Sequence, residues 1–215
     1  MMDIETIKPK NAKSLKSIRN TKVERIEFED EFFDAFGSPQ NRGIWLVWGG
    51  SGSGKSSFIM KTIKELARLD NDVLYNLLEE DPDDDSFIDR IKTFKMHEVE
   101  DRIKVGQYTP EELRVILRRR NSAKVVVIDS LTYFTRSFDE FISITKEFRD
   151  KIWIFTAHAK GPNPKEEIEI KAMYHAYMKI RVDAYAAYCK GRSIGANGGQ
   201  FIIWHQRYKE LNGND

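Results

Sequence analysis

The chain has 215 residues, with 35 basic and 34 acidic side chains and a formal net charge of +1. This length predicts one domain with a sizeable core and excludes a large enzyme with appended modules. The near balance of charge excludes binding to nucleic acid through bulk positive charge, so any such contact needs a local patch.

The cysteine content and the apolar runs indicate where the protein works. Cys189 is the one cysteine, so no internal disulfide can form, and the N-terminal segment MMDIETIKPKNAK lacks the apolar core of a signal peptide. The longest apolar runs, such as IWLVW and VVVI, are far shorter than the roughly 20 residues that cross a bilayer. We therefore expect a soluble, cytoplasmic protein without a membrane partner.

Residues 8–25 are basic, weakly apolar and without a clear period, which indicates an arm. Such an arm is either a solvated tail or a contact for nucleic acid or a protein partner. The next segment, FEDEFFDAFG, predicts a short helix closed by Gly37. These features divide the chain into a basic arm with a short helix (1–36), a core (37–208) and a polar tail (209–215).

The strongest motif follows a strand predicted at 42–48 and precedes a helix predicted at 55–69. Residues 49–56 read GGSGSGKS and satisfy the P-loop pattern in the strand, loop and helix context that the pattern requires. Main-chain amides of this loop can wrap a β-phosphate, while the Lys55 ammonium reaches the β- and γ-phosphate oxygens. The predicted nucleotide contacts are Gly49, Gly50, Ser51, Gly52, Ser53, Gly54, Lys55, Ser56 and Ser57.

Strands and helices alternate through the middle of the chain. VLYNLL predicts a strand at 73–78, an acidic cluster continues to Asp85, and a polar, helical stretch extends to about Val105. TPEELRVILRRR predicts a helix that begins with a capping box formed by Thr109 and Glu112. This alternation is typical of parallel sheets with helical crossovers.

The second half of the chain supplies the remaining strands. KVVVID at 124–129 and KIWIFTAH at 151–158 are continuous apolar runs, typical of strands buried on both faces of a parallel sheet. A helix with a capping box is predicted to begin at Ser137. Residues 178–188 alternate with a period of two and predict a strand, which the loop KGRSIGANGG joins to QFIIWHQ as an antiparallel hairpin. The fold class predicted is α/β, a three-layer sandwich around a mostly parallel sheet.

Two carboxylates are candidates for a magnesium-dependent hydrolytic site. Asp129 ends the apolar run at 124–129 in the manner of a Walker B aspartate, where it can hold Mg²⁺ together with the hydroxyl of Ser56. Many such ATPases carry a glutamate directly after this aspartate, but Ser130 stands there, so the base must come from elsewhere. Glu79 is the candidate, because a strand beside the P-loop strand would deliver it toward the γ-phosphate. Glu80 is the alternative, and both side chains can instead belong to the solvated acidic cluster.

His158 ends the last buried strand of the predicted sheet. It is either a γ-phosphate sensor or a structural polar residue. No spacing of cysteine and histidine indicates a zinc site, and no N-K-x-D guanine motif is found in the sequence. The expected ligands are therefore ATP and Mg²⁺, although no motif in the sequence indicates which nucleobase is bound.

Residues 37–204 resemble the RecA-type ATPase core of RadA, KaiC and the DnaB replicative helicases. YNLLEED is similar to the family's strand that ends in a glutamate pair, VVIDSLTYF to its Walker B strand, and FTAHAK to the histidine-bearing strand end of RadA. CKGRSIGANGGQFIIW resembles the lysine-x-arginine loop and the glycine-rich strand of DnaB and RadA.

The resemblance implies roles for several residues. It makes Glu79, the first member of the pair, the catalytic base, and it lets Lys190 and Arg192 reach the nucleotide of a neighbouring subunit in a homo-oligomer, such as a hexameric ring or a filament. Those two residues can instead form an exposed hairpin tip. It also places KGPNPKEEIEIK, after His158, where the family has a DNA-contacting loop, although the glutamates weaken that role.

No counterpart of the zinc module of RadA or of the N-terminal helical domain of DnaB is found, so the chain looks like the small stand-alone RecA-type ATPases of phages and mobile elements. We expect an oligomer that hydrolyses Mg-ATP and acts on single-stranded DNA in recombination, replication or repair. The alternatives are a KaiC-like, nucleotide-dependent regulatory module without DNA motor activity and a small-molecule kinase built on the same P-loop.

Overall fold

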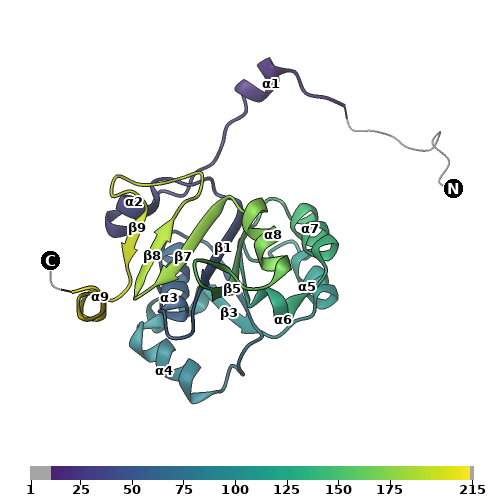
Figure 1. Ribbon diagram of the computed structural model, residues 1–215. Helices are drawn as coiled ribbons and strands as arrows, with labels where there is room; N and C mark the ends of the chain where they lie inside the picture. The colour runs from purple at the N-terminus through teal and green to yellow at the C-terminus, as the bar shows by residue number, and fades with distance from the viewer. Residues whose placement is uncertain (1–10, 214–215) are drawn as a thin grey trace.

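A computed structural model describes residues 11–213, and within them the strands form one nine-stranded sheet (Figure 1). The order is β3-β2-β4-β5-β1-β7-β8-β9, and β6 pairs with β5. The first six strands of this order run parallel, whereas β8 and β9 are antiparallel additions at one edge. The strands are β1 (Gly43–Gly49), β2 (Val73–Leu77), β3 (Ile103–Gly106), β4 (Val125–Asp129), β5 (Ile152–Lys160), β6 (Asn163–Pro164), β7 (Met178–Asp183), β8 (Ala186–Cys189) and β9 (Gln200–Ile202).

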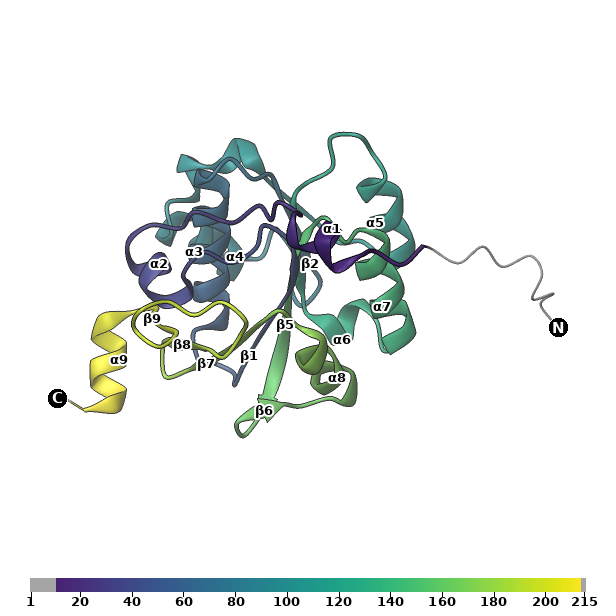
Figure 2. The ribbon, with the colours of Figure 1, turned by 90° about the horizontal axis from the view of Figure 1, so that it is seen from above.

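Helices cover both faces of the sheet, as Figure 2 shows from above. One face carries α2, α3 and α4, and the other carries α5, α6, α7 and α8. The predicted α/β three-layer architecture with its C-terminal antiparallel hairpin is therefore confirmed. The helices are α1 (Leu15–Arg19), α2 (Asp30–Phe36), α3 (Lys55–Arg68), α4 (Asp85–Thr93), α5 (Pro110–Leu117), α6 (Leu131–Phe134), α7 (Phe138–Glu147), α8 (Glu167–His175) and α9 (His205–Asn212).

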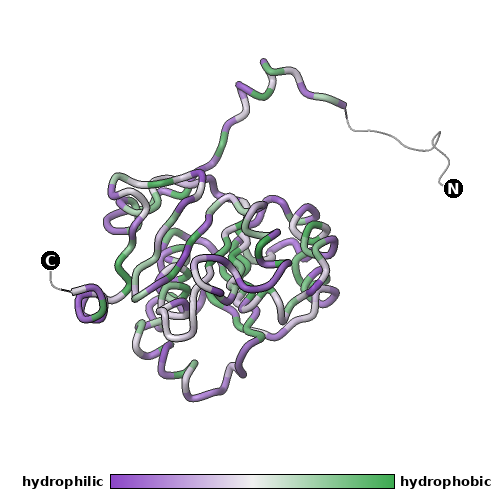
Figure 3. Tube along the Cα trace, viewed as in Figure 1, coloured by the Kyte–Doolittle hydropathy of each residue, from purple (hydrophilic) through white to green (hydrophobic). Residues whose placement is uncertain are grey.

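Two hydrophobic cores explain why the central strands are apolar throughout. In β4, Val125 and Val127 pack into the core under α3, whereas Val126 and Ile128 pack into the core under α5 and α7. A strand that is buried on both faces needs apolar side chains at every position, which is the pattern that KVVVID shows. Figure 3 colours the chain trace by hydropathy, and the green, hydrophobic stretches gather in the middle of the fold while purple, hydrophilic stretches lie along its periphery.

The predicted helix caps form, with one difference. Thr109 and Glu112 close a complete capping box at the start of α5. At α7 the Ser137 hydroxyl accepts the amide of Glu140, but the Glu140 carboxylate forms an ion pair with Arg114 of α5 instead of returning to the cap. The prediction of a capping box at Ser137 was therefore half right, because a tertiary ion pair competes for the glutamate.

The segment from 178 to 188 is not one strand, as its alternation predicts, but two. Ala184 and Tyr185 form a tight turn with φ of 45° and 58°, and β8 folds back antiparallel on β7. The helix predicted to extend to about Val105 ends at Thr93 and is followed by two 3₁₀ turns and by the edge strand β3. In KGPNPKEEIEIK, β6 and the start of α8 replace the expected loop.

The terminal segments differ in how they attach to the core. α1 has no buried residue and stands away from the body in Figure 1, whereas in α2 the ring of Phe32 lies 4.5 Å from that of Phe201 in β9. The division of the chain at 36 and 208 stays a prediction. Within residues 11–213, no helix combines the length and the apolar character needed to cross a membrane.

Candidate functional site

The P-loop joins β1 to α3 at the carboxyl end of the sheet. Gly52 and Gly54 have φ of 71° and 102°, which is the left-handed region that favours glycine. A Cβ at Gly49 would lie 2.4 Å from the carbonyl oxygen of Val182, so this position has no space for a side chain. A Cβ at Gly50 or Gly52 would meet nothing within 4 Å, so these glycines border open space where phosphates can approach the backbone.

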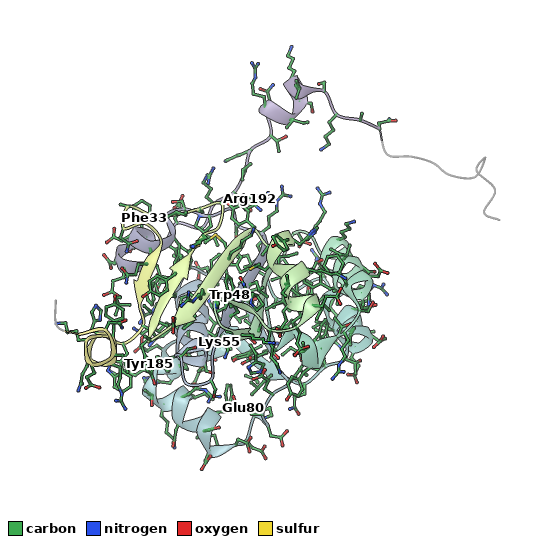
Figure 4. The ribbon with its side chains drawn as sticks, viewed as in Figure 1. Phe33, Trp48, Lys55, Glu80, Tyr185 and Arg192 are labelled. Carbon is green, nitrogen blue, oxygen red and sulfur yellow. The ribbon has the colours of Figure 1, made fainter. Side chains whose placement is uncertain are left out.

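The β7–β8 turn holds the P-loop from one side. The amide of Tyr185 donates to the carbonyl of Ser53 at 3.0 Å, and its ring lies against Gly54. Trp204 packs edge-on against the Tyr185 ring, with the centroids 5.6 Å apart. The sequence did not predict these contacts, because neither the turn nor the aromatic pair carries a recognised motif. Figure 4 shows Tyr185 beside the loop that carries Lys55.

An unpaired polar atom in the loop indicates that the loop can bind a nucleotide phosphate. The Ser53 Oγ is buried and has no hydrogen-bond partner within the described residues. A buried hydroxyl is rarely left unpaired in a protein, and a phosphate oxygen at this loop would satisfy it. The helix α3 begins directly after Gly54, so its positive N-terminal dipole points at the same place.

Asp129 is held by hydroxyl groups from both neighbouring strands. The Tyr75 hydroxyl of β2 donates to Oδ2 at 2.7 Å, and the Thr156 hydroxyl of β5 donates to Oδ1. Burial raises the pKa of Asp129, and the bonds from Thr156 and Tyr75 oppose this shift by stabilising the charged form. Burial and the nearby carboxylate raise the pKa of Tyr75 as well, so its hydroxyl keeps its proton and remains a donor.

The structure brings Glu79 and His158 together at the carboxyl end of the sheet. His158 Nε2 lies 3.0 Å from Glu79 Oε1, and His158 pairs in register with Gly49, the first residue of the P-loop. The amide of Glu79 donates to the carbonyl of Asp129 at 3.1 Å, which fixes its backbone beside the end of β4. Both side chains are partly exposed, so a water molecule or a phosphate can reach them.

Glu80 points to a different environment. Its carboxylate forms an ion pair with Arg90 of α4 and accepts the Ser86 hydroxyl at 2.8 Å. The geometry therefore favours Glu79 over Glu80 as the group that faces the nucleotide.

Lys190 and Arg192 do not join this site. The amide of Arg192 donates to the carbonyl of Tyr177, and that of Lys190 donates to the carbonyl of Lys179, so both lie where β7 begins. The P-loop lies where β1 ends, and Figure 4 shows Arg192 near the top of the fold and Lys55 well below it. Within one chain these two residues cannot contact the nucleotide bound at its own P-loop.

A metal ion would have few protein ligands here. The residues from 11 to 213 contain no group of three or more His, Cys, Asp and Glu side chains placed to hold a metal. Mg²⁺ in phosphate sites is typically bound by one or two protein groups, several water molecules and the phosphates themselves. Ser56, in the first turn of α3, and Asp129 fit that requirement.

A pocket of about 610 Å³, which the sequence did not predict, begins at His158 and extends between α6 and α8. Its lining includes Tyr133, Arg136, Lys165 and Lys171, and the Tyr133 side chain is exposed. The amide of Lys165 donates to the carbonyl of His158 at 2.8 Å, so the pocket wall and the histidine are directly connected. Glu166 and Glu167 also line the pocket and form ion pairs with Lys165 at 3.3 Å and with Lys171 at 2.6 Å. Arg136 is therefore the cation of this lining that has no ion pair within residues 11–213.

Buried Glu169 supports this wall from below. Its Oε2 accepts the amides of Glu166 and Lys165 at 2.9 and 3.2 Å, whereas Oε1 has no partner within the described residues. Burial raises the pKa of Glu169.

The comparisons with known proteins support the fold. No protein-family model matches the sequence, and no curated protein matches it. Among solved structures, the chain is similar to the KaiC-like protein PH0186 from Pyrococcus horikoshii OT3, with a TM-score of 0.62 and 19% identity over 84% of this chain and 99% of that one. It is also similar to the flagellar accessory protein FlaH from Methanocaldococcus jannaschii, with a TM-score of 0.57 and 15% identity over 84% and 92% of the two chains. At these identities the likeness shows a common RecA-like fold.

Proposed function

We propose that this protein binds ATP with Mg²⁺ and hydrolyses it. The observation that carries the proposal is that the P-loop, Asp129 and the Glu79–His158 pair all lie at the carboxyl end of the sheet. A glycine-rich turn without a nucleotide would need neither a carboxylate held by two hydroxyls nor a second carboxylate beside a histidine.

Each residue has a distinct role in this proposal. Lys55 and the loop amides bind the phosphates, and Asp129 and Ser56 hold the metal, which neutralises phosphate charge when bound. Glu79 orients the attacking water and accepts its proton at Oε1 or Oε2. His158 donates from Nε2 to Glu79 when that nitrogen carries the proton, and thus links the base to the strand end beside the γ-phosphate.

The test is ATP turnover by the wild type and by Lys55→Ala and Glu79→Gln. Loss of turnover in both variants, with fluorescent nucleotide still bound by Glu79→Gln, would support the proposal. A Glu79→Gln protein that turns over ATP at the wild-type rate would contradict the assignment of the base.

We further propose that the protein acts as an oligomer on single-stranded DNA, as a stand-alone core of the phage or mobile-element kind. The pocket between α6 and α8 supports this, because exposed Tyr133 can stack on a base while Arg136, which has no ion pair within residues 11–213, contacts a phosphate. DNA should stimulate turnover in the wild type and not in Tyr133→Ala or Arg136→Ala, which keep the P-loop intact.

The second candidate is a nucleotide-dependent regulatory module. It is favoured by the likeness to the KaiC-like protein PH0186 and by the same pocket, which can receive a protein segment instead of DNA. An ATP turnover rate that DNA does not change, but that Glu79→Gln still lowers, would favour this function. The small-molecule kinase is less well supported, because the arginine run that would form a lid begins at Arg118, which is bound to Glu147 of α7.

A further inference from the structure

The four tryptophans of the sequence differ in how far solvent reaches them. Trp45, Trp48 and Trp153 are buried in the two hydrophobic cores, whereas Trp204 is 49% exposed. A tryptophan ring has a large apolar area and a π-face, so an exposed ring is a strong contact for a ligand that covers it. The position of Trp204 therefore bears on what the protein binds.

Trp204 belongs to a wall that adjoins the P-loop. A Cβ at Gly54, the residue before Lys55, would lie 3.0 Å from the ring of Tyr185 and 3.5 Å from the side chain of Ile203. Trp204 follows Ile203 in the chain, and its ring packs edge-on against the Tyr185 ring. We call Tyr185 and Trp204 the aromatic pair. This pair lies beside the point where the P-loop enters α3.

The backbone of Tyr185 has a conformation that is unusual for a bulky residue. Its φ is 58°, and that of Ala184 is 45°, both in the left-handed region that favours glycine. The Tyr185 amide donates to the Ser53 carbonyl at 3.0 Å, and its carbonyl accepts the amide of Ile203 at 2.8 Å. Residues stay in this region where surrounding contacts fix them, and such positions cluster at ligand sites. The fold therefore holds an aromatic ring in place against the phosphate loop.

The base of a nucleotide is the ligand group that suits the aromatic pair. One ribose joins the base to the phosphates, so a nucleotide held by the P-loop keeps its base close to the surface that borders the loop. Every nucleobase has a π-face, and its stacking on an aromatic side chain strengthens binding by about tenfold. The pair thus continues the phosphate site with a platform for the base.

The polar groups beside the aromatic pair do not distinguish one purine from the other. The Arg207 guanidinium lies 5.7 Å from the centroid of the Trp204 ring and is bound to Glu210 at 3.0 Å. The Tyr185 hydroxyl and the exposed His205 ring make no hydrogen bond with any residue from 11 to 213. A hydroxyl and an imidazole can each donate or accept, so they suit the edge of adenine and that of guanine alike.

We propose that the aromatic pair is the nucleobase site of this protein and that it selects bases by stacking alone. The ligands are then purine nucleoside triphosphates, with adenine and guanine accepted equally. A purine covers more of the two rings than a pyrimidine does, so ATP and GTP bind more tightly than CTP and UTP. This inference rests on the proposed function in one respect, that the P-loop binds the phosphates, and it widens the substrate from ATP to both purines.

Tryptophan fluorescence tests the site directly, because the exposed tryptophan is Trp204. ADP and GDP with Mg²⁺ should each quench the emission and protect Trp204 from acrylamide, and their dissociation constants should agree within about threefold. Inorganic tripolyphosphate fills the P-loop without a base and should change neither signal. Trp204→Phe should keep the affinity for both nucleotides and lose the fluorescence change, which assigns the signal to this residue.

A truncation of the ring measures its contribution to binding. Calorimetry with Trp204→Ala should show about tenfold weaker binding of ADP and of GDP, with the affinity for tripolyphosphate unchanged. Tyr174→Ala is the matched control, because Tyr174 is an exposed aromatic residue of α8 outside this wall, and it should change none of the three affinities.

Three results would overturn the inference while the P-loop proposal stands. They are quenching by tripolyphosphate equal to that by ADP, nucleotide affinities that Trp204→Ala leaves unchanged, and a preference for ADP over GDP of about tenfold or more. Absence of binding by tripolyphosphate and by every nucleotide would instead overturn the proposed function, and the base site with it.

Discussion

At the carboxyl end of the sheet the candidate functional side chains are held by contacts within the chain, whereas the exposed cations at the amino end are not. At the carboxyl end Glu79 contacts His158, and Asp129 is held by hydroxyls from the strands on either side. At the amino end Lys146, Arg149 and Arg192 are exposed, and none of these three has an ion pair within residues 11–213. The difference is that contacts within the chain fix the side chains at the carboxyl end, whereas the exposed cations at the amino end have no such contacts within residues 11–213.

The largest expected effect is at the P-loop lysine. Lys55→Ala should remove measurable ATP turnover and weaken nucleotide binding, because one charge-assisted donor to a developing negative charge contributes about a hundredfold or more to the rate. Turnover and fluorescent-nucleotide titration measure the two effects. If the variant binds and turns over ATP normally, the carboxyl end is not the nucleotide site.

The next effect separates two adjacent carboxylates. Glu79→Gln should lower turnover by on the order of a thousandfold while nucleotide binding remains, because the amide cannot accept the proton of water. Glu80→Gln is the matched control, since Glu80 is bound to Arg90 and Ser86 of α4. Equal losses in both variants would argue against the assignment of Glu79.

The third prediction tests whether the amino end acts on a neighbour. Arg192→Ala should lower turnover by about a hundredfold when the protein is assembled. Mixing it with inactive Lys55→Ala should restore part of the activity, because each Lys55→Ala subunit still offers Arg192 to a neighbour with an intact P-loop. Absence of any recovery would place the arginine outside catalysis.

A smaller effect is expected where Tyr75 holds Asp129. Tyr75→Phe removes the donor at 2.7 Å and leaves a buried carboxylate oxygen with one partner fewer, which should lower the free energy of unfolding by about 1–3 kcal/mol. The Mg²⁺ concentration needed for ADP binding should rise, as measured by calorimetry. Tyr108→Phe, whose hydroxyl makes no hydrogen bond within residues 11–213, should change neither quantity.

The smallest effect concerns the support of the pocket wall. Because burial raises the pKa of Glu169, the folded protein binds a proton that the unfolded chain has released in the interval above pH 4.5. Stability contributed by this group is therefore present at low pH and falls as the pH rises through the raised pKa. Glu169→Gln keeps the acceptor for the two amides and should flatten this part of the stability curve in urea unfolding. An unchanged slope would mean that Glu169 does not titrate there.

Sequence patterns predicted most of the fold because buried strands and capped helices leave local signatures. They failed at the β7–β8 turn for a physical reason. A turn of two residues shifts the alternation by one, so Ile180 and Val182 face the core under α3 before the turn, and Ala187 and Cys189 do so after it. Residues 184–189 read AYAAYC and carry no charged side chain, so the sequence pattern does not show this shift. Ala184 and Tyr185 also adopt positive φ without glycine or asparagine, so no turn residue marks the position.

The site was predictable only in part. The P-loop and Asp129 follow from motif and strand context, whereas the contacts of Tyr75 and Thr156 with Asp129 depend on which strands are neighbours in the sheet. Edge strand β3 was missed because it has only four residues and its side chains are at most half-buried. The large pocket beside His158 joins segments from α6 and α8, which no local pattern relates to each other.

The strand β8 lies between the turn that contacts the P-loop and the loop that carries Arg192. Tyr185, just before it, donates its amide to the P-loop, and Lys190, just after it, begins the loop that carries Arg192. The four residues between them form a β-strand that is hydrogen-bonded to β7 on one side and to β9 on the other. The Ser53 carbonyl of the P-loop and the loop that carries Arg192 are thus attached to opposite ends of the same short strand.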